Sequence, residues 1–283
     1  MISTAFEDYL SRLGVTRPGA PSVEALFALQ RAHLERVPYE NIDIQLGRPP
    51  GIEPELSVRR FAAGQGGYCF HLNGGFAALL EALGYDVTRH VAGVHEDPEG
   101  RGANGNHLAL TVRVGGEGWF VDAGLGDGPH EPLPLRPGTY RQGPFTYRME
   151  PSATEPGGWT FFNEGGPFPV MEMAGRPATM ADFAAEHVRL STAPDSPFLG
   201  TFTALRRDAK GLDVLRGRVL TRVDTAGRSE RTLRTPDEWY GALADVFGRN
   251  LDALDTADRA ALWERVTRAH EAWLAARAQA PTG

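Results

Sequence analysis

The apolar residues in the first third of the chain recur at intervals of three or four, which is the spacing of one face of a helix. This pattern predicts a first helix that ends at Gly14 and a second helix that Ser22 caps and Pro38 ends. A third helix is expected to begin near Cys69 and to finish at Gly84. The N-terminal part of the chain is therefore expected to be helical.

After the third helix the pattern changes to that of short strands. Residues 85–94 form one expected strand, and the polar residues 95–105 are expected to be an exposed loop. Residues 107–114 alternate between two faces. The glycines at 115–116 make a good two-residue hairpin turn, which leads into a return strand that ends at Asp122.

The remainder of the chain mixes turn-rich segments with short elements. Residues 123–146 are rich in glycine and proline and are expected to be an extended loop. Thr179 and Thr235 each have an acidic residue three positions on, which is typical of a capped helix start. We further expect strands near 147–149, 158–163 and 168–173, an antiparallel pair over 198–206 and 212–223, and a last helix from about residue 256. The expected helices come first, the strands follow, and a mixture comes last. This order predicts an α+β fold and not alternating βαβ units.

Composition narrows the class of protein. The chain has 283 residues and a formal net charge of −7, so it lacks the basic footprint of a nucleic-acid-binding protein. No apolar run is long enough to span a bilayer, and the first residues lack a signal-peptide pattern. We therefore expect a cytoplasmic protein without a nucleic-acid or membrane partner. A single cysteine excludes an internal disulfide and a multi-cysteine zinc site, and the histidines show no metal-ligand spacing.

That cysteine, Cys69, follows Gly66-Gly67 at the expected start of the third helix. The helix dipole favours the thiolate there, and N–H groups of a Gly-Gly turn can bind an oxyanion. His107 and Asp122 follow later and complete the set of a thiolate nucleophile, its base and the group that orients the base. The alternative is a buried, inert thiol. If Cys69 is considered without its neighbours in the sequence, that alternative is favoured.

The register of the expected hairpin decides whether His107 and Asp122 can meet. If the turn lies at 115–116, Ala109 faces Asp122, and His107 lies diagonally opposite on the same face, about 7–8 Å away at the backbone. A hydrogen bond between the two side chains can span that gap. The alternative is a solvated histidine and a strand-ending aspartate; the shared face favours the pair.

A glycine-rich loop directly follows the aspartate. Its glycines at 124, 126 and 128 could admit a ligand close to the three candidate residues. The alternative is a flexible turn. The loop is not a phosphate-binding P-loop, because the Gly-Lys-Ser/Thr ending is absent.

Taken together, these segments resemble one family, the arylamine N-acetyltransferases. The resemblance is carried by Val37-Pro38-Tyr39-Glu40-Asn41-Ile42, by Gly66-Gly67-Tyr68-Cys69-Phe70 with Asn73, by Asn106-His107-Leu108, and by Val121-Asp122-Ala123-Gly124-Leu125-Gly126. The spacing between the motifs also fits, and the clear match spans about residues 20–135.

The resemblance implies a fold of three parts. A helical bundle over residues 1–84 would carry the cysteine, an antiparallel β-barrel over 85–195 would carry the histidine and the aspartate, and an α/β lid would cover 196–283. The Cys-His-Asp core would be of the papain or transglutaminase kind.

The resemblance also implies ping-pong acyl transfer. Cys69 would attack acetyl-CoA, hold the acetyl group as a thioester and pass it to an aryl amine, a hydrazine or an N-hydroxyarylamine. His107 would serve as the base and Asp122 as the orienting acid. Acetyl-CoA would be a substrate, and neither a bound cofactor nor a metal is implied. The residues expected to line the substrate site are Tyr39, Tyr68, Phe70, Leu125, Gly126 and Phe202.

The chain departs from the family pattern at a few positions. Gln65 stands where the family usually has arginine, and His71-Leu72 replaces the usual Glu-Gln or similar pair. Leu125 replaces a frequent phenylalanine, and Asp127 places a negative charge in the glycine-rich loop.

Three other functions stay open at this point. Some relatives are amide synthases, which take a longer acyl group from CoA or from an acyl carrier protein, and a smaller Leu125 suits a bulkier acyl group. A transglutaminase-like or papain-like thiol hydrolase shares the order of the three residues. A non-catalytic binding protein is the last alternative, and the complete Cys-His-Asp set argues against it.

Overall fold

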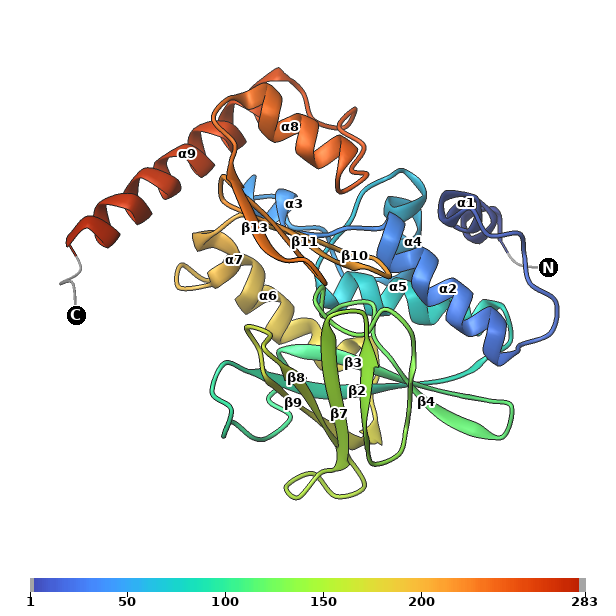
Figure 1. Cartoon of the computed structure of the whole chain (residues 1–283). Helices are drawn as coiled ribbons and strands as arrows, with labels where there is room; N and C mark the ends of the chain where they lie inside the picture. The colour runs from blue at the N-terminus through green and yellow to red at the C-terminus, as the bar shows by residue number, and fades with distance from the viewer. Residues whose placement is uncertain (1–2, 280–283) are drawn as a thin grey trace.

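The computed structural model describes residues 3–279, with helices towards both ends of the chain and most strands in the middle (Figure 1). The helical elements are α1 (Thr4–Leu13), α2 (Val23–Arg36), α3 (Ile42–Gln45), α4 (Pro54–Ala62), α5 (Cys69–Ala82), the 3-10 helix η1 (Met180–Phe183), α6 (Ala184–Thr192), α7 (Pro197–Gly200), α8 (Pro236–Asp245) and α9 (Thr256–Gln279). The predicted α+β class is confirmed.

Local signals set the ends of the N-terminal helices. α1 ends at Gly14, whose φ of 62° is in the left-handed region that glycine adopts without strain. Ser22 Oγ accepts the N–H of Ala25 at 3.1 Å and so caps α2. The three predicted helices are confirmed. α3 and α4 were not predicted, because four and nine residues are too few to display a sustained apolar period.

The middle of the chain forms an antiparallel sheet of eight strands that curls into a nearly closed barrel (Figure 1). In spatial order the strands are β5 (Leu133–Pro134), β4 (Glu117–Val121), β3 (His107–Val114), β2 (Asp86–His95), β9 (Val170–Pro177), β8 (Trp159–Glu164), β7 (Phe145–Pro151) and β6 (Gly138–Gln142). Val114 pairs with Glu117 and Leu110 with Val121, so the predicted hairpin and its register are confirmed.

The prediction that residues 123–146 are an extended loop is wrong in part. The segment contains β5, β6 and the start of β7. β5 and β6 are the two edges of the sheet. Edge strands tolerate proline and glycine, because one side of the strand needs no ladder hydrogen bonds. Turn-rich composition therefore hid two edge strands.

A second antiparallel sheet joins the N-terminal and C-terminal parts of the chain. Its strands, in spatial order, are β1 (Tyr39–Glu40), β10 (Thr203–Arg207), β11 (Gly211–Arg216), β12 (Val219–Asp224) and β13 (Gly227–Thr232). The predicted pair over 198–206 and 212–223 is wrong in detail. Residues 197–200 are the helix α7, and a turn at Gly217 divides the second predicted strand into β11 and β12.

Packing is continuous across the boundaries predicted for the three parts. The cluster that contains the helices also includes Leu108, Leu110 and Val112 from β3 and Leu190 from α6. A second cluster joins Ile42 to the C-terminal helices, and a third fills the barrel. The ranges 1–84, 85–195 and 196–283 stay a prediction. Within residues 3–279, no helix combines the length and apolarity needed to cross a membrane.

Candidate active site

The loop before Cys69 is fixed by close contact with the β1 segment. A Cβ on Gly66 would lie 2.1 Å from the carbonyl oxygen of Pro38, so only glycine fits there. Gly67 forms a bridge with Tyr39, and its carbonyl accepts the N–H of Glu40 at 2.8 Å. The Gly-Gly pair thus allows two backbones to meet immediately before Cys69.

Cys69 is the first residue of α5 and is 4% exposed. Its Sγ lies 3.7 Å from the carbonyl oxygen of Asn106, and the thiol is close enough to the ring of His107 to help raise the pKa of that imidazole. A helix N-terminus and a neighbouring imidazolium are environments in which cysteine reacts as its thiolate. The thiol is buried, as the inert alternative requires, but its place at a helix start beside His107 is the one expected of a reactive cysteine.

The predicted pairing of His107 with Asp122 is confirmed. His107 Nε2 lies 2.7 Å from Asp122 Oδ2, and both side chains are buried, so the solvated alternative is wrong. Burial works against the charged imidazole. The charges and hydrogen bonds of Asp122 and Cys69 outweigh that cost and raise the pKa of His107 to about 10. This contribution to stability is fully present below pH 6.5 and is lost as the pH rises through about 10.

Four donors converge on the carboxylate of Asp122. Oδ2 accepts from His107, while Oδ1 accepts the N–H groups of Gly124 and Leu125 at 2.8 and 2.9 Å. The side-chain amide of Asn73 is the fourth donor, at 3.1 Å from Oδ1. A buried carboxylate bonded in this way has one orientation, so it also fixes the imidazole.

Asn73, which belongs to one of the motifs that carry the family resemblance, makes contacts that the sequence alone did not reveal. Its amide donates to the carbonyl of Leu108 at 2.6 Å, and its oxygen accepts the N–H of Ala123 at 2.8 Å. It therefore ties α5 to β3 and to the segment after β4. The available signal was its spacing: Asn73 lies four residues after Cys69, on the same face of the helix.

Gly124 is a second residue whose importance for the packing around Cys69 only the structure makes clear. A Cβ there would lie 2.9 Å from the Cα of Cys69 and 2.9 Å from Asn73 Nδ2. The glycine-rich loop therefore packs directly on the start of α5. That its glycines admit a ligand close to the three candidate residues stays a prediction.

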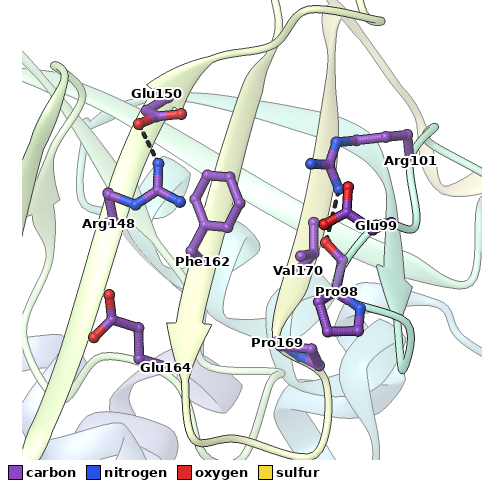
Figure 2. Close-up of a pocket in the computed structure, with 9 residues that line it drawn as sticks. All are labelled: Pro98, Glu99, Arg101, Arg148, Glu150, Phe162, Glu164, Pro169 and Val170. Atoms are coloured by element: carbon purple, nitrogen blue, oxygen red, sulfur yellow. Dashed lines mark hydrogen bonds and ion pairs between the residues drawn. The ribbon is translucent and has the colours of Figure 1, made fainter.

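A surface pocket of about 410 Å³ lies on the outside of the barrel, and none of the predicted site residues lines it. Figure 2 shows Arg148 between Glu150 and the ring of Phe162, with Arg101 across the pocket. Because the charges of its lining side chains are mixed and Arg148 is paired with Glu150, this pocket provides no alternative catalytic set. Among residues 3–279, no group of three or more His, Cys, Asp and Glu side chains is placed to hold a metal ion.

Known proteins share both the sequence and the fold. A family model described as N-acetyltransferase matches residues 22–256. The chain belongs to the arylamine N-acetyltransferase family. Proansamycin X synthase of Amycolatopsis mediterranei is 35% identical over 149 residues, which cover 50% of this chain and 57% of that protein. The arylamine N-acetyltransferase / N-hydroxyarylamine O-acetyltransferase of Salmonella typhimurium is 36% identical over 129 residues, covering 45% and 46%. The chain thus spans about half the length of these relatives.

The fold is that of the arylamine N-acetyltransferases over nearly the whole chain. The structure of Mycobacterium marinum arylamine N-acetyltransferase in complex with CoA superposes with a TM-score of 0.83. It covers 93% of this chain and 99% of that chain, at 24% identity.

Of the residues predicted from the family to line the substrate site, Tyr39 lies near Cys69 and Leu125 bonds to Asp122, while Gly126 follows in the glycine-rich loop. Tyr39 is half-buried, and burial, Cys69 and Asp127 together raise the pKa of its phenol well above the usual value. Leu125 is also half-buried and lies in the loop bonded to Asp122. Gly126 has a φ of 78° and lies against Leu205 of β10. Their contact with a substrate stays a prediction.

The other three lie in packed surroundings. The Tyr68 hydroxyl is 2.6 Å from His187 Nδ1 on α6, and the ring of Phe70 packs against Phe183. Phe202 is buried, with its ring 4.8 Å from that of Trp239. Contact of these side chains with a substrate also stays a prediction.

Two of the departures from the family pattern, His71 and Asp127, have a local structural account. Burial lowers the pKa of His71 to about 3, so its neutral ring can accept the N–H of Tyr68 at 3.4 Å. Asp127 is buried and accepts a hydrogen bond from Asn163 at 2.9 Å. Burial raises the pKa of Asp127 to about 6, so its carboxylate is charged at neutral pH.

Replacing Asn73 with alanine should both destabilise the fold and slow catalysis. Asn73→Ala leaves the Leu108 carbonyl and the Ala123 N–H unsatisfied, so we expect a loss of about 2–3 kcal/mol in urea unfolding. We also expect kcat/KM to fall about tenfold or more, because Asp122 loses a donor and α5 loses its tie to β3.

The matched control is Asn41→Ala. Asn41 is an equally buried amide that bonds Phe198, Thr201 and Thr203 and touches none of the three candidate residues. The Asn41→Ala substitution should lower the free energy of unfolding by a similar amount and leave kcat/KM within about threefold of the wild-type value. Equal losses of kcat/KM in the two variants would contradict the assigned role of Asn73.

Proposed function

We propose that this protein transfers an acetyl group from acetyl-CoA to an aryl amine, a hydrazine or an N-hydroxyarylamine through a thioester on Cys69. The observation that carries the proposal is one line of side chains, from Cys69 at the start of α5 to His107, whose pKa Cys69 helps to raise, and on through a 2.7 Å hydrogen bond to Asp122. Such a line supplies a nucleophile, a proton carrier and an orienting acid. Family membership and the shared fold support the reaction class.

In the first half-reaction the thiolate of Cys69 attacks the carbonyl carbon of the acetyl thioester. The C–S bond to CoA breaks, and the imidazolium of His107 gives its proton to the departing CoA sulfur. The products are free CoA, acetyl-Cys69 and a neutral His107. Backbone N–H groups at the start of α5 would stabilise the oxyanion.

In the second half-reaction the amine nitrogen attacks the acetyl carbon. His107 accepts the proton that the amine loses, and the Cys69 thiolate leaves. The imidazolium–thiolate pair is thereby restored. One site serves both steps, so CoA must depart before the amine reacts, and initial-rate plots should give parallel lines.

Two relatives support the choice of substrates. The Mycobacterium marinum structure contains CoA, which supports a CoA thioester as the donor. The Salmonella typhimurium relative is named for arylamine N-acetyl transfer and N-hydroxyarylamine O-acetyl transfer, which supports aromatic acceptors. Tyr39 and Leu125 beside the triad would give such a ring an apolar surface.

A second function, amide synthesis with a longer acyl group, is favoured by a specific observation. The relative that matches at 35% identity is named proansamycin X synthase. The chemistry at Cys69 would be the same, and only the acyl group and its carrier would differ. A CoA thioester or an acyl carrier protein would then be the donor.

Intact-protein mass spectrometry decides between the two donors. Acetyl-CoA without an acceptor should add one acetyl group to the wild-type protein, because the chain has a single cysteine. Cys69→Ser should show no adduct, fold normally and lose at least about 10³-fold in turnover, since only the thiolate is nucleophilic enough. Substantial turnover by purified Cys69→Ser would rule out the covalent mechanism. An adduct from a longer acyl thioester but none from acetyl-CoA would favour amide synthesis.

The acceptor pocket should prefer flat aromatic amines. With acetyl-CoA as donor, we expect 5-aminosalicylate and hydralazine to be acetylated at least about tenfold faster than spermidine, because a charged aliphatic amine gains little from apolar walls. The measurement is kcat/KM for each acceptor. Preference for spermidine would overturn the aryl amine assignment. Inactivity with all three, despite a formed acetyl-enzyme, would favour the amide synthase.

A further inference from the structure

A buried ion pair connects the C-terminal part of the chain to the loop that carries Cys69. Arg249, which follows α8, donates from Nε to Glu40 Oε1 at 3.1 Å. The side chains of Arg249 and Glu40 are only 1% and 2% exposed. Removing one partner of such a pair leaves an uncompensated charge in the protein interior.

Glu40 holds the loop before Cys69 by both its side chain and its backbone. Its Oε1 also accepts the N–H of Gly66 at 3.2 Å, and its own N–H donates to the carbonyl of Gly67 at 2.8 Å. Gly67 is followed by Tyr68, the cap residue of α5, and then by Cys69. The position of Sγ therefore depends on the position of Glu40.

The segment around Arg249 also contacts this loop directly. The N–H of Asn250 donates to the carbonyl of Gly64 at 2.8 Å, and a Cβ on Gly64 would lie 2.8 Å from the Cβ of Asn250. Position 65, where the family usually has arginine, is Gln65, which carries no charge. The cation that meets Glu40 is Arg249, which lies 209 positions away in the sequence.

We propose that Arg249 is a positioning residue for acyl transfer, acting through Glu40 on the Gly66-Gly67 backbone and so on the direction of Cys69 Sγ. The inference rests on the proposed role of Cys69 as the nucleophile. A misplacement of about 1 Å can cost about 10²-fold in rate, so a change at Arg249 reaches the chemistry without touching a substrate.

Alkylation by iodoacetamide tests this without any acyl transfer. Cys69 is the only thiol, so the mass adduct reports on it alone. At pH 7, and well below each variant's melting temperature, Arg249→Met should lower the second-order rate constant of the folded protein about tenfold or more. Glu40→Gln should give a loss of the same size. The double variant should lose no more than either single variant, because the two side chains act in one chain of contacts.

Arg207→Met is the matched control. The Arg207 side chain is as deeply buried as that of Arg249, but its guanidinium bonds the carbonyls of Gly211 and Gln142, away from the Cys69 loop. We expect Arg207→Met to lower the melting temperature and to leave the alkylation rate of the folded protein within about twofold of wild type.

Three results would overturn the proposal. One is an alkylation rate within twofold of wild type in folded Arg249→Met or, if that variant does not fold, in Glu40→Gln. Another is an equal loss in Arg207→Met, which would mean that general destabilisation is the cause. The last is rate losses that multiply in the double variant. Failure of the wild type to form an acyl-enzyme would contradict the proposed function and leave this comparison intact.

Discussion

The structure of the site depends on the carboxylate of Asp122, on which four hydrogen-bond donors converge. Those donors come from three places: His107 on β3, Asn73 on α5, and the backbone at Gly124 and Leu125. A buried charge is tolerated only when its hydrogen bonds are satisfied, so these segments can meet in only one arrangement. The requirement of one carboxylate thereby brings the helical part and the barrel together at the active site.

The C-terminal part of the chain is connected to the candidate site in a similar way, through the hydrogen bonds of a buried carboxylate. Glu40 is a second buried carboxylate, and its donors are Arg249, the N–H of Gly66 and the N–H of Ile42. The two carboxylates lie on opposite sides of Cys69 in the sequence, and each has partners from a distant segment. The C-terminal sheet with α8 and α9 is therefore connected to the chemistry by charge and hydrogen bonds as well as by apolar packing.

The parts of the fold and of the candidate site that could be predicted from the sequence are those that local signals determine. A glycine with positive φ ended α1, and the turn at Gly115-Gly116 set a hairpin register that placed His107 and Asp122 on one face. Because such features act over a few residues, a single sequence reveals them. The edge strands β5 and β6 and the Glu40–Arg249 pair were not predicted. Turn-rich composition hid the two edge strands. The Glu40–Arg249 pair joins residues too far apart in the sequence for any local periodicity to relate them.

The central claim is that Asp122 and Cys69 keep His107 cationic in a buried site. Nuclear magnetic resonance of the imidazole nitrogens in the wild-type protein, followed against pH, measures this directly. We expect His107 to carry both protons through neutral pH and to lose one only near pH 10. His33 and His71, whose pKa values burial lowers to about 3, should stay neutral over the same range and serve as internal references. Loss of the His107 proton near pH 6.5, the value of an unperturbed imidazole, would contradict the account.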